Sequence, residues 1–133
     1  MTAPYSRLKA MRFASLITAI NVLVASGFSI AGLVRPQSIL PPGDAPTEAS
    51  FIFAMYAAAR TIPLALISLV AIYRRSTAAV LILGLLAGVI QFVDASVGIL
   101  QHDPGKFAGP MVIAILQFFA IFMLRKSMDK PIR

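Results

Sequence analysis

Apolar residues along the chain fall into four long runs, which short polar or proline-rich segments separate. The runs span about 11–34, 49–73, 77–100 and 107–124. Each is close to the ~20 residues that a helix needs to cross a hydrocarbon core of about 30 Å. Because backbone N–H and C=O groups in lipid must be satisfied within the segment, the runs are predicted to be helices. The pattern therefore predicts an all-α integral membrane protein with four transmembrane helices.

The segments between the runs indicate how the predicted helices are connected. Segment 35–48 is rich in proline, so it cannot continue a helix and should form an ordered external loop. Segment 74–76 (RRS) predicts a tight turn, and segment 102–106 (HDPGK) predicts a second one. Short turns join antiparallel neighbours, so we expect an up-down-up-down four-helix bundle that forms a single transmembrane domain over 1–133.

Composition and charge agree with this pattern. Hydrophobic residues make up 59% of the chain and charged residues 13%, against about half and about a quarter in soluble domains. The formal net charge of +7 comes from basic residues that flank the apolar runs, which is typical of membrane proteins and not of nucleic-acid binding. Nine of them are expected on the side of the termini and two on the other side. The nine are Arg7, Lys9, Arg12, Arg74, Arg75, Arg125, Lys126, Lys130 and Arg133, and the two are Arg35 and Lys106. This bias predicts a multi-pass protein of the cell membrane with both termini cytoplasmic.

The chain offers little for metal or thiol chemistry. It has no cysteine and one histidine, so disulfides and cysteine nucleophiles are excluded and a zinc or haem site has too few ligands. We interpret His102, beside Asp103, as a solvated turn residue. Glu48, at the start of the second run, is interpreted as a charge that complements the helix dipole. The sequence predicts no metal and no cofactor.

Two charged residues stand well inside the apolar runs, Arg60 in the second and Asp94 in the third. Each charge costs at least ~2.5 kcal/mol within the membrane, so both should face the bundle interior and be paired or solvated. Counted from the external ends, they lie at depths of roughly 17 Å and 10 Å, at about 1.5 Å per residue. An arginine side chain can cover that difference, so an ion pair between Arg60 and Asp94 is geometrically reasonable.

Uncharged polar residues from all four runs fall at a similar depth. Gln91 is one turn from the aspartate of the third run, and Tyr56 is one turn from the arginine of the second. Gln117 belongs to the fourth run, and Asn21 belongs to the first, on a face with Thr18. The four helices are therefore expected to form one polar layer.

Two interpretations of this polar layer stay open. In the first, Asp94 and Arg60 are catalytic and Gln91, Gln117, Asn21 and Tyr56 bind the substrate. A base, a charge stabiliser and orienting donors suit proton-transfer chemistry on a lipophilic small molecule, as in an isomerase, a cyclase or an epoxide-opening hydrolase. In the second, the layer fixes helix register in a non-catalytic membrane subunit of a larger complex. A small transporter is a further alternative, although the first run lacks the glutamate expected of small four-helix multidrug exporters.

Small residues and a proline shape the same region. Gly84 and Gly88 form a GxxxG pair, which favours close helix packing either inside the bundle or in a homo-oligomer. Pro63 follows Arg60 by three residues and should kink the second helix.

Several short motifs resemble those of a group of small bacterial membrane proteins. They are 60–66 (RTIPLAL), 73–75 (YRR), 91–95 (QFVDA), 109–110 (GP) and 116–117 (LQ). In size and layout the chain is similar to uncharacterised four-helix proteins of the DoxX-like group. The resemblance implies the bundle and no particular reaction. Relatives in the DoxX-like group have been linked to thiol-oxidising complexes, but a direct thiol role does not carry over to a chain without cysteine.

Overall fold

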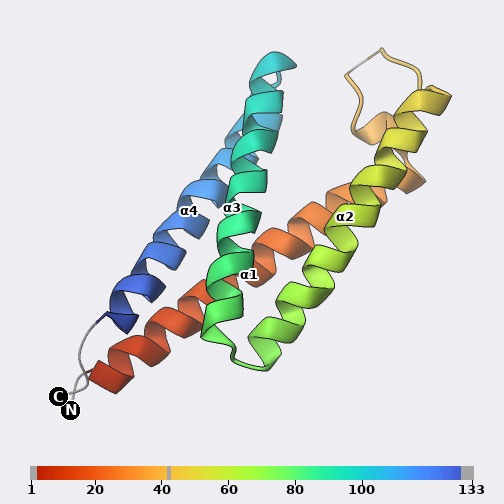
Figure 1. Cartoon of the computed structure of the whole chain (residues 1–133). Coiled ribbons are helices and arrows are strands. Elements are labelled where there is room, and N and C mark those ends of the chain that lie inside the picture. The colour runs from red at the N-terminus through yellow and green to blue at the C-terminus, as the bar shows by residue number, and fades with distance from the viewer. Residues whose placement is uncertain (1–2, 42, 130–133) are drawn as a thin grey trace.

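The computed structural model describes residues 3–41 and 43–129 and consists of four long helices (Figure 1). They are α1 (Ala3–Val34), α2 (Glu48–Tyr73), α3 (Thr77–Leu100) and α4 (Pro104–Met128), and a short 3-10 helix, η1 (Pro36–Ser38), follows α1. All four are long and apolar enough to cross a membrane. The all-helical class and the four predicted helices are confirmed.

The structure corrects the predicted ends of two helices. Helix α1 begins at Ala3, well before position 11, because residues such as Leu8, Lys9 and Ala10 are good helix formers although not all are apolar. Helix α4 extends to Met128 and carries Arg125 and Lys126 in its last turn, where cations interact favourably with the helix dipole. Lys130 and Arg133, which were counted among the basic residues, lie outside the described residues.

The start of α4 shows that segment 102–106 is a turn only in its first part. Pro104 is the first residue of α4, a position that suits proline because no helical partner exists there for an N–H. The Asp103 carboxylate accepts hydrogen bonds from the backbone N–H groups of Gly105 and Lys106, at 3.0 and 3.1 Å. Asp103 therefore caps the helix and fixes its start.

The α2–α3 and α3–α4 connections share one backbone geometry. Arg75 and His102 occupy the left-handed region, with φ of 52° and 51°. In each turn this residue and the next one, Ser76 or Asp103, donate their N–H groups to carbonyls of the last helical turn, at 3.0–3.1 Å. These are Schellman motifs, in which glycine is the usual left-handed residue. The two turns make consecutive helices antiparallel (Figure 1).

The two ends of the bundle differ in how the helices meet. At the end where α1 begins, here called the closed end, a core of small and aliphatic residues joins all four helices. It consists of Ala10, Ala14, Ala71, Val80, Ala120 and Leu124. At the opposite end, here called the open end, α2 and α3 diverge, and α1 follows α2 (Figure 1).

The glycines of α3 pack against α4. A Cβ atom at Gly84 would lie 2.6 Å from Cδ1 of Ile121, and one at Gly88 would lie 2.9 Å from Cε1 of Phe118. At Gly98 it would lie 2.5 Å from the backbone carbonyl carbon of Lys106. The GxxxG pair is thus used inside the bundle, where the absence of side chains lets α3 and α4 approach closely.

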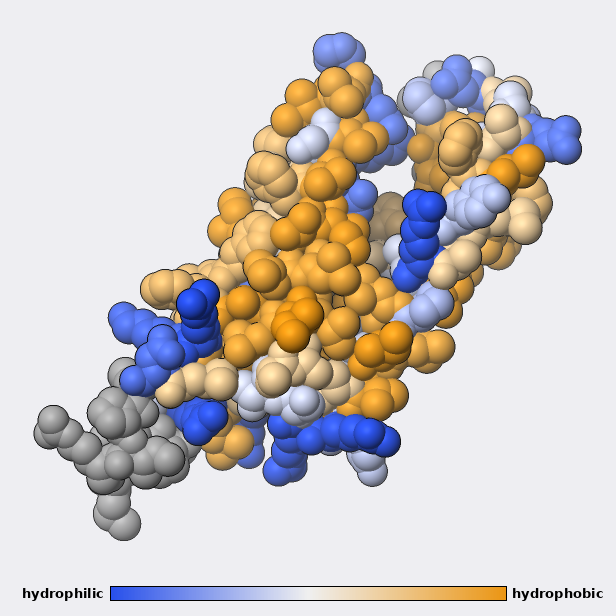
Figure 2. Space-filling view, in the orientation of Figure 1, coloured by the Kyte–Doolittle hydropathy of each residue, from blue (hydrophilic) through white to orange (hydrophobic). Residues whose placement is uncertain are grey.

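The outer surface of the molecule is apolar over its middle. Hydrophobic side chains form a broad band there, and hydrophilic side chains gather toward the two ends (Figure 2). In each span, only 22–33% of the most apolar stretch of 18 residues is buried inside the molecule. An apolar surface of this extent requires a non-aqueous environment. The four spans and this surface indicate a multi-pass membrane protein.

Candidate functional site

Three buried amide side chains and one hydroxyl form a continuous chain of hydrogen bonds among α1, α3 and α4. Gln91 Nε2 donates to Asn21 Oδ1 at 2.9 Å, and Asn21 Nδ2 donates to Gln117 Oε1 at 3.2 Å. Gln117 Nε2 donates in turn to Thr18 Oγ1 at 2.9 Å. All four residues are at most 3% exposed. The structure therefore brings together three of the predicted site residues, and we call these four residues the amide network.

The amide network is satisfied by its own members. Among the described residues, the one buried side-chain nitrogen or oxygen atom without a partner is Ser68 Oγ of α2, which lies outside the network. A buried amide left unpaired costs about 1–3 kcal/mol, so each member depends on the others for its burial. The network fixes the rotation and depth of α1 relative to α3 and α4.

Helix α2 is joined to α1 by a smaller set of polar contacts. Thr61 Oγ1 lies 2.8 Å from Ser29 Oγ and 3.0 Å from the carbonyl oxygen of Ala57. Ser26 Oγ donates to the carbonyl of Thr61 at 3.4 Å. These hydroxyls hold α2 against the second half of α1 without involving α3.

A shallow, open groove lies where α1, α2 and α3 meet, and its cavity volume is about 10 Å³. Its lining is almost entirely apolar. The lining residues are Asn21, Val22 and Ala25 of α1, Thr61 and Leu64 of α2, and Ala87 and Ile90 of α3. Toward the open end the surface is hollowed between α2 and α3 (Figure 2). We call this hollow, with the groove as its floor, the cleft.

The two charged residues of the spans lie one helical turn from the groove. Arg60 precedes Leu64 by four residues, and Asp94 follows Ile90 by four. Residues four apart share a helix face, and in both cases the step leads toward the open end. Arg60 and Asp94 therefore belong to the two sides of the cleft, above an apolar floor.

The expectation that these charges face a closed interior as an ion pair is wrong. Both side chains are exposed, and among the described residues neither forms an ion pair or a side-chain hydrogen bond. The reason is the divergence of α2 and α3, which separates positions that would meet in a bundle with parallel sides (Figure 1).

Tyr56 is also separate from the amide network. Its side chain is 58% exposed and makes no hydrogen bond with the described residues. Helix α2 continues through Pro63, so this proline does not end the helix. Of the six predicted site residues, three meet in the amide network, two flank the cleft, and Tyr56 lies apart from both groups.

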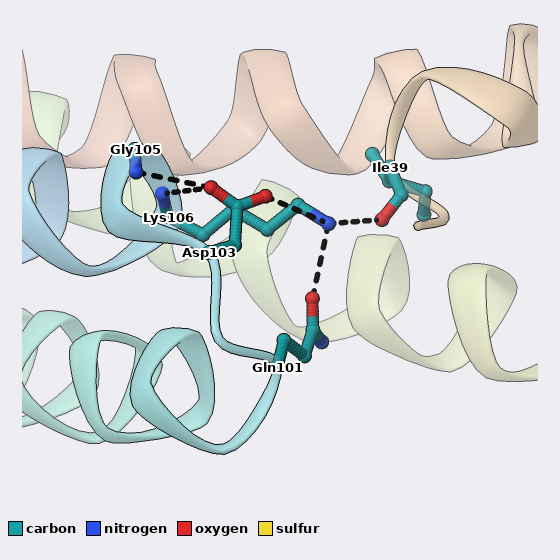
Figure 3. Close-up of polar contacts among 5 residues, drawn as sticks. All are labelled: Ile39, Gln101, Asp103, Gly105 and Lys106. Carbon is teal, nitrogen blue, oxygen red and sulfur yellow. Dashed lines mark hydrogen bonds and ion pairs between the residues drawn. The ribbon is translucent and has the colours of Figure 1, made fainter. Parts of the chain in front are cut away.

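Lys106 makes a set of contacts at the open end, here called the lysine clasp, that was not predicted from the sequence. Lys106 Nζ donates to the backbone carbonyl of Ile39 at 2.9 Å and to Gln101 Oε1 at 3.0 Å, and lies 3.6 Å from Asp103 Oδ2 (Figure 3). The clasp joins the segment after α1 to the start of α4. The pKa of Asp103 is lowered, chiefly by the hydrogen bond from the backbone N–H of Lys106. The N–H of Gly105 and the Lys106 ammonium act in the same direction. The sequence shows a lysine two residues after a proline that begins a helix. It does not identify the partner of this lysine, because Ile39 is 67 residues away.

Comparisons with protein-family models, with curated protein sequences and with solved structures found no match to this chain. The similarity to the DoxX-like group stays a prediction. The cleft and the amide network are the features of the molecule that indicate a function.

Proposed function

We propose that this protein binds a lipophilic small molecule that carries a polar group, and that the cleft between α2 and α3 is its binding site. The apolar part of the molecule lies in the hollow between α2 and α3, above the groove that Val22, Leu64 and Ile90 line. Its polar group lies one turn closer to the open end, between Arg60 and Asp94. The observation that carries this proposal is the pairing of an apolar groove with two opposite charges that have no partner in the described chain.

Electrostatics favours an occupied cleft over an empty one. An unpaired charge within a membrane span is costly, and such residues usually face a water-filled cavity or a functional partner. A polar group held between a guanidinium and a carboxylate accepts from the first and donates to the second. The same group would screen each charge from the surrounding lipid.

A proton-transfer reaction is a natural extension of this binding mode. Asp94 would act as the base and Arg60 would stabilise the negative charge that develops, as in isomerisation, epoxide opening or cyclisation. Gln91 and Gln117 are committed to the amide network, so their role is to position Asn21. Asn21 is the network member that also lines the groove, and it is the amide that a ligand would touch.

The basic residues set the orientation that we propose for the bundle. The described basic residues of the closed end include Arg12, Arg74, Arg75 and Arg125, whereas the open end carries Arg35 and Lys106. By the positive-inside bias, the closed end and both termini are cytoplasmic. The cleft then opens in the outer half of the cell membrane.

A non-catalytic subunit of a larger complex is the second candidate. The amide network favours it, because three of the predicted site residues are accounted for by contacts inside this chain. In that case the cleft receives a transmembrane helix of a partner, whose polar residue meets Arg60 and Asp94.

Native mass spectrometry of protein gently extracted from its own host distinguishes the two. We expect a bound small molecule on the wild type that is lost from Asp94→Asn and from Arg60→Gln, with helix content unchanged. Asp44→Asn and Arg125→Gln make the same charge changes away from the cleft, and both should retain the molecule. An empty wild type whose cleft variants shed a protein partner would replace the binding proposal with the subunit.

A further inference from the structure

A second groove lies at the closed end, between the first turns of α1 and the last turn of α2, far from the cleft. It is open, and its cavity volume is about 240 Å³. Its lining residues are Leu8, Met11, Arg12, Ser15, Ile72 and Arg75. We call it the basal groove. Unlike the cleft, it combines two charges of the same sign with an apolar wall.

Both arginines of the basal groove are free to bind an external group. Among the described residues, the side chains of Arg12 and Arg75 make no ion pair and no hydrogen bond. They come from different helices, and the place of each is set by the fold. Arg12 lies in the continuous helix α1, and Arg75 is held in a left-handed conformation whose backbone N–H is bonded to Ile72 at 3.0 Å.

The charge balance around the basal groove favours an anion. No acidic residue lines it. Of the chain's five acidic residues, Asp44, Glu48, Asp94 and Asp103 lie at or toward the open end, and only Asp129 follows α4 at the closed end. Two guanidinium groups on one groove suit a phosphate, whose oxygens accept paired N–H donors in a fixed geometry.

The apolar wall indicates that the phosphate belongs to a lipid. Leu8, Met11 and Ile72 line the same groove and would offer nothing to a free inorganic anion. Arg75 lies two residues beyond the end of the span Glu48–Tyr73, at the level where phospholipid headgroups lie. We infer that the basal groove is a binding site for an anionic phospholipid, with its phosphate between Arg12 and Arg75 and an acyl chain along Leu8, Met11 and Ile72.

The test compares two double variants in lipid nanodiscs that contain equal amounts of phosphatidylglycerol and phosphatidylcholine. Arg12→Gln with Arg75→Gly removes both groove charges, and glycine suits the left-handed position that Arg75 occupies. Arg125→Gln with Lys126→Gln removes the same formal charge from the last turn of α4. Native mass spectrometry after release from the nanodisc counts the phospholipids that each protein retains.

We expect the wild type and the α4 variant to retain phosphatidylglycerol in preference to phosphatidylcholine. The groove variant should retain it roughly ten-fold less, since each basic residue near a headgroup contributes a several-fold gain in anionic-lipid binding. Equal losses in both double variants would overturn the site, because they would show that only the overall charge matters. Displacement of the lipid by millimolar inorganic phosphate would overturn the role of the acyl chain. Arg12→Gln alone leaves the turn intact and gives the same comparison if the double variant does not fold.

Discussion

Helix α3 meets its two neighbours in the chain in different ways. Toward α4 it presents glycines, and the two helices approach until backbone meets backbone at Gly98. Toward α2 it presents Ala87 and Ile90, and the two helices diverge around an open groove. The first interface is closed by contacts within this chain, and the second leaves room for something else.

The difference follows from the kind of polar group on each side. Neutral amides can satisfy one another in a low-dielectric interior, as Asn21 and Gln117 do, because each has both donors and acceptors. Charged groups lose much more solvation on burial and need excellent geometry to recover it. In this fold, the amides hold helices together and Arg60 and Asp94 lie where the helices separate.

The largest effect is expected from adding a side chain where α3 and α4 pack closely together. We expect Gly98→Ala to destabilise the protein by about 3 kcal/mol, because the added methyl meets the backbone of Lys106 and no side chain can move aside. The check is unfolding in a mixed detergent followed by helical circular dichroism. Gly109→Ala is the matched control, since a Cβ there meets nothing within 4 Å, and it should be neutral or slightly stabilising. Equal stability of the two variants would contradict the close packing of this interface.

A smaller loss is expected from the amide network. Gln117→Leu removes the partner of both Thr18 and Asn21, so unfolding in the same assay should become easier by roughly 2 kcal/mol. The exposed Gln37 provides the control, and Gln37→Leu should change stability by less than about 0.5 kcal/mol. If the two leucine variants were equally stable, the network would not hold the helices.

The cleft charges should affect stability less than the network does, even though we place them in the binding site. In a double-mutant cycle of Arg60→Gln and Asp94→Asn, we expect a coupling energy below about 0.5 kcal/mol, because the two side chains form no ion pair. The cycle is measured with unfolding free energies of ligand-free protein. A coupling above about 1 kcal/mol would mean that α2 and α3 close and that the charges pair after all.

The smallest effect should be a pH dependence at the open end. Because hydrogen bonds and Lys106 lower the pKa of Asp103 in the folded protein, its carboxylate stabilises the fold above its ordinary unfolded pKa. That contribution should disappear as the pH falls through the lowered folded pKa. The difference in Tm between the wild type and Asp103→Asn should therefore be small at neutral pH and vanish in strong acid. A difference that grew on acidification would contradict the helix cap.

Much of the polar layer was predictable, but not its division into two groups. Depth along each helix follows from counting residues, so the meeting of Asn21, Gln91 and Gln117 could be anticipated. The separation of Arg60 from Asp94 could not, because it depends on the angle between α2 and α3. The same holds for the Lys106 clasp, whose acceptor at Ile39 lies in a proline-rich loop with no periodic pattern.

The sequence by itself determined that four helices exist and are apolar enough to cross a membrane, because that requirement is local to about twenty residues. It also placed a polar residue at similar depth in each helix. Only the tertiary structure decided which of these side chains face one another, since each residue turns a helix by about 100° and a modest splay moves side chains several ångströms apart. Packing of the α3 glycines against α4 closed one interface, and divergence from α2 left Arg60 and Asp94 on the two sides of a cleft.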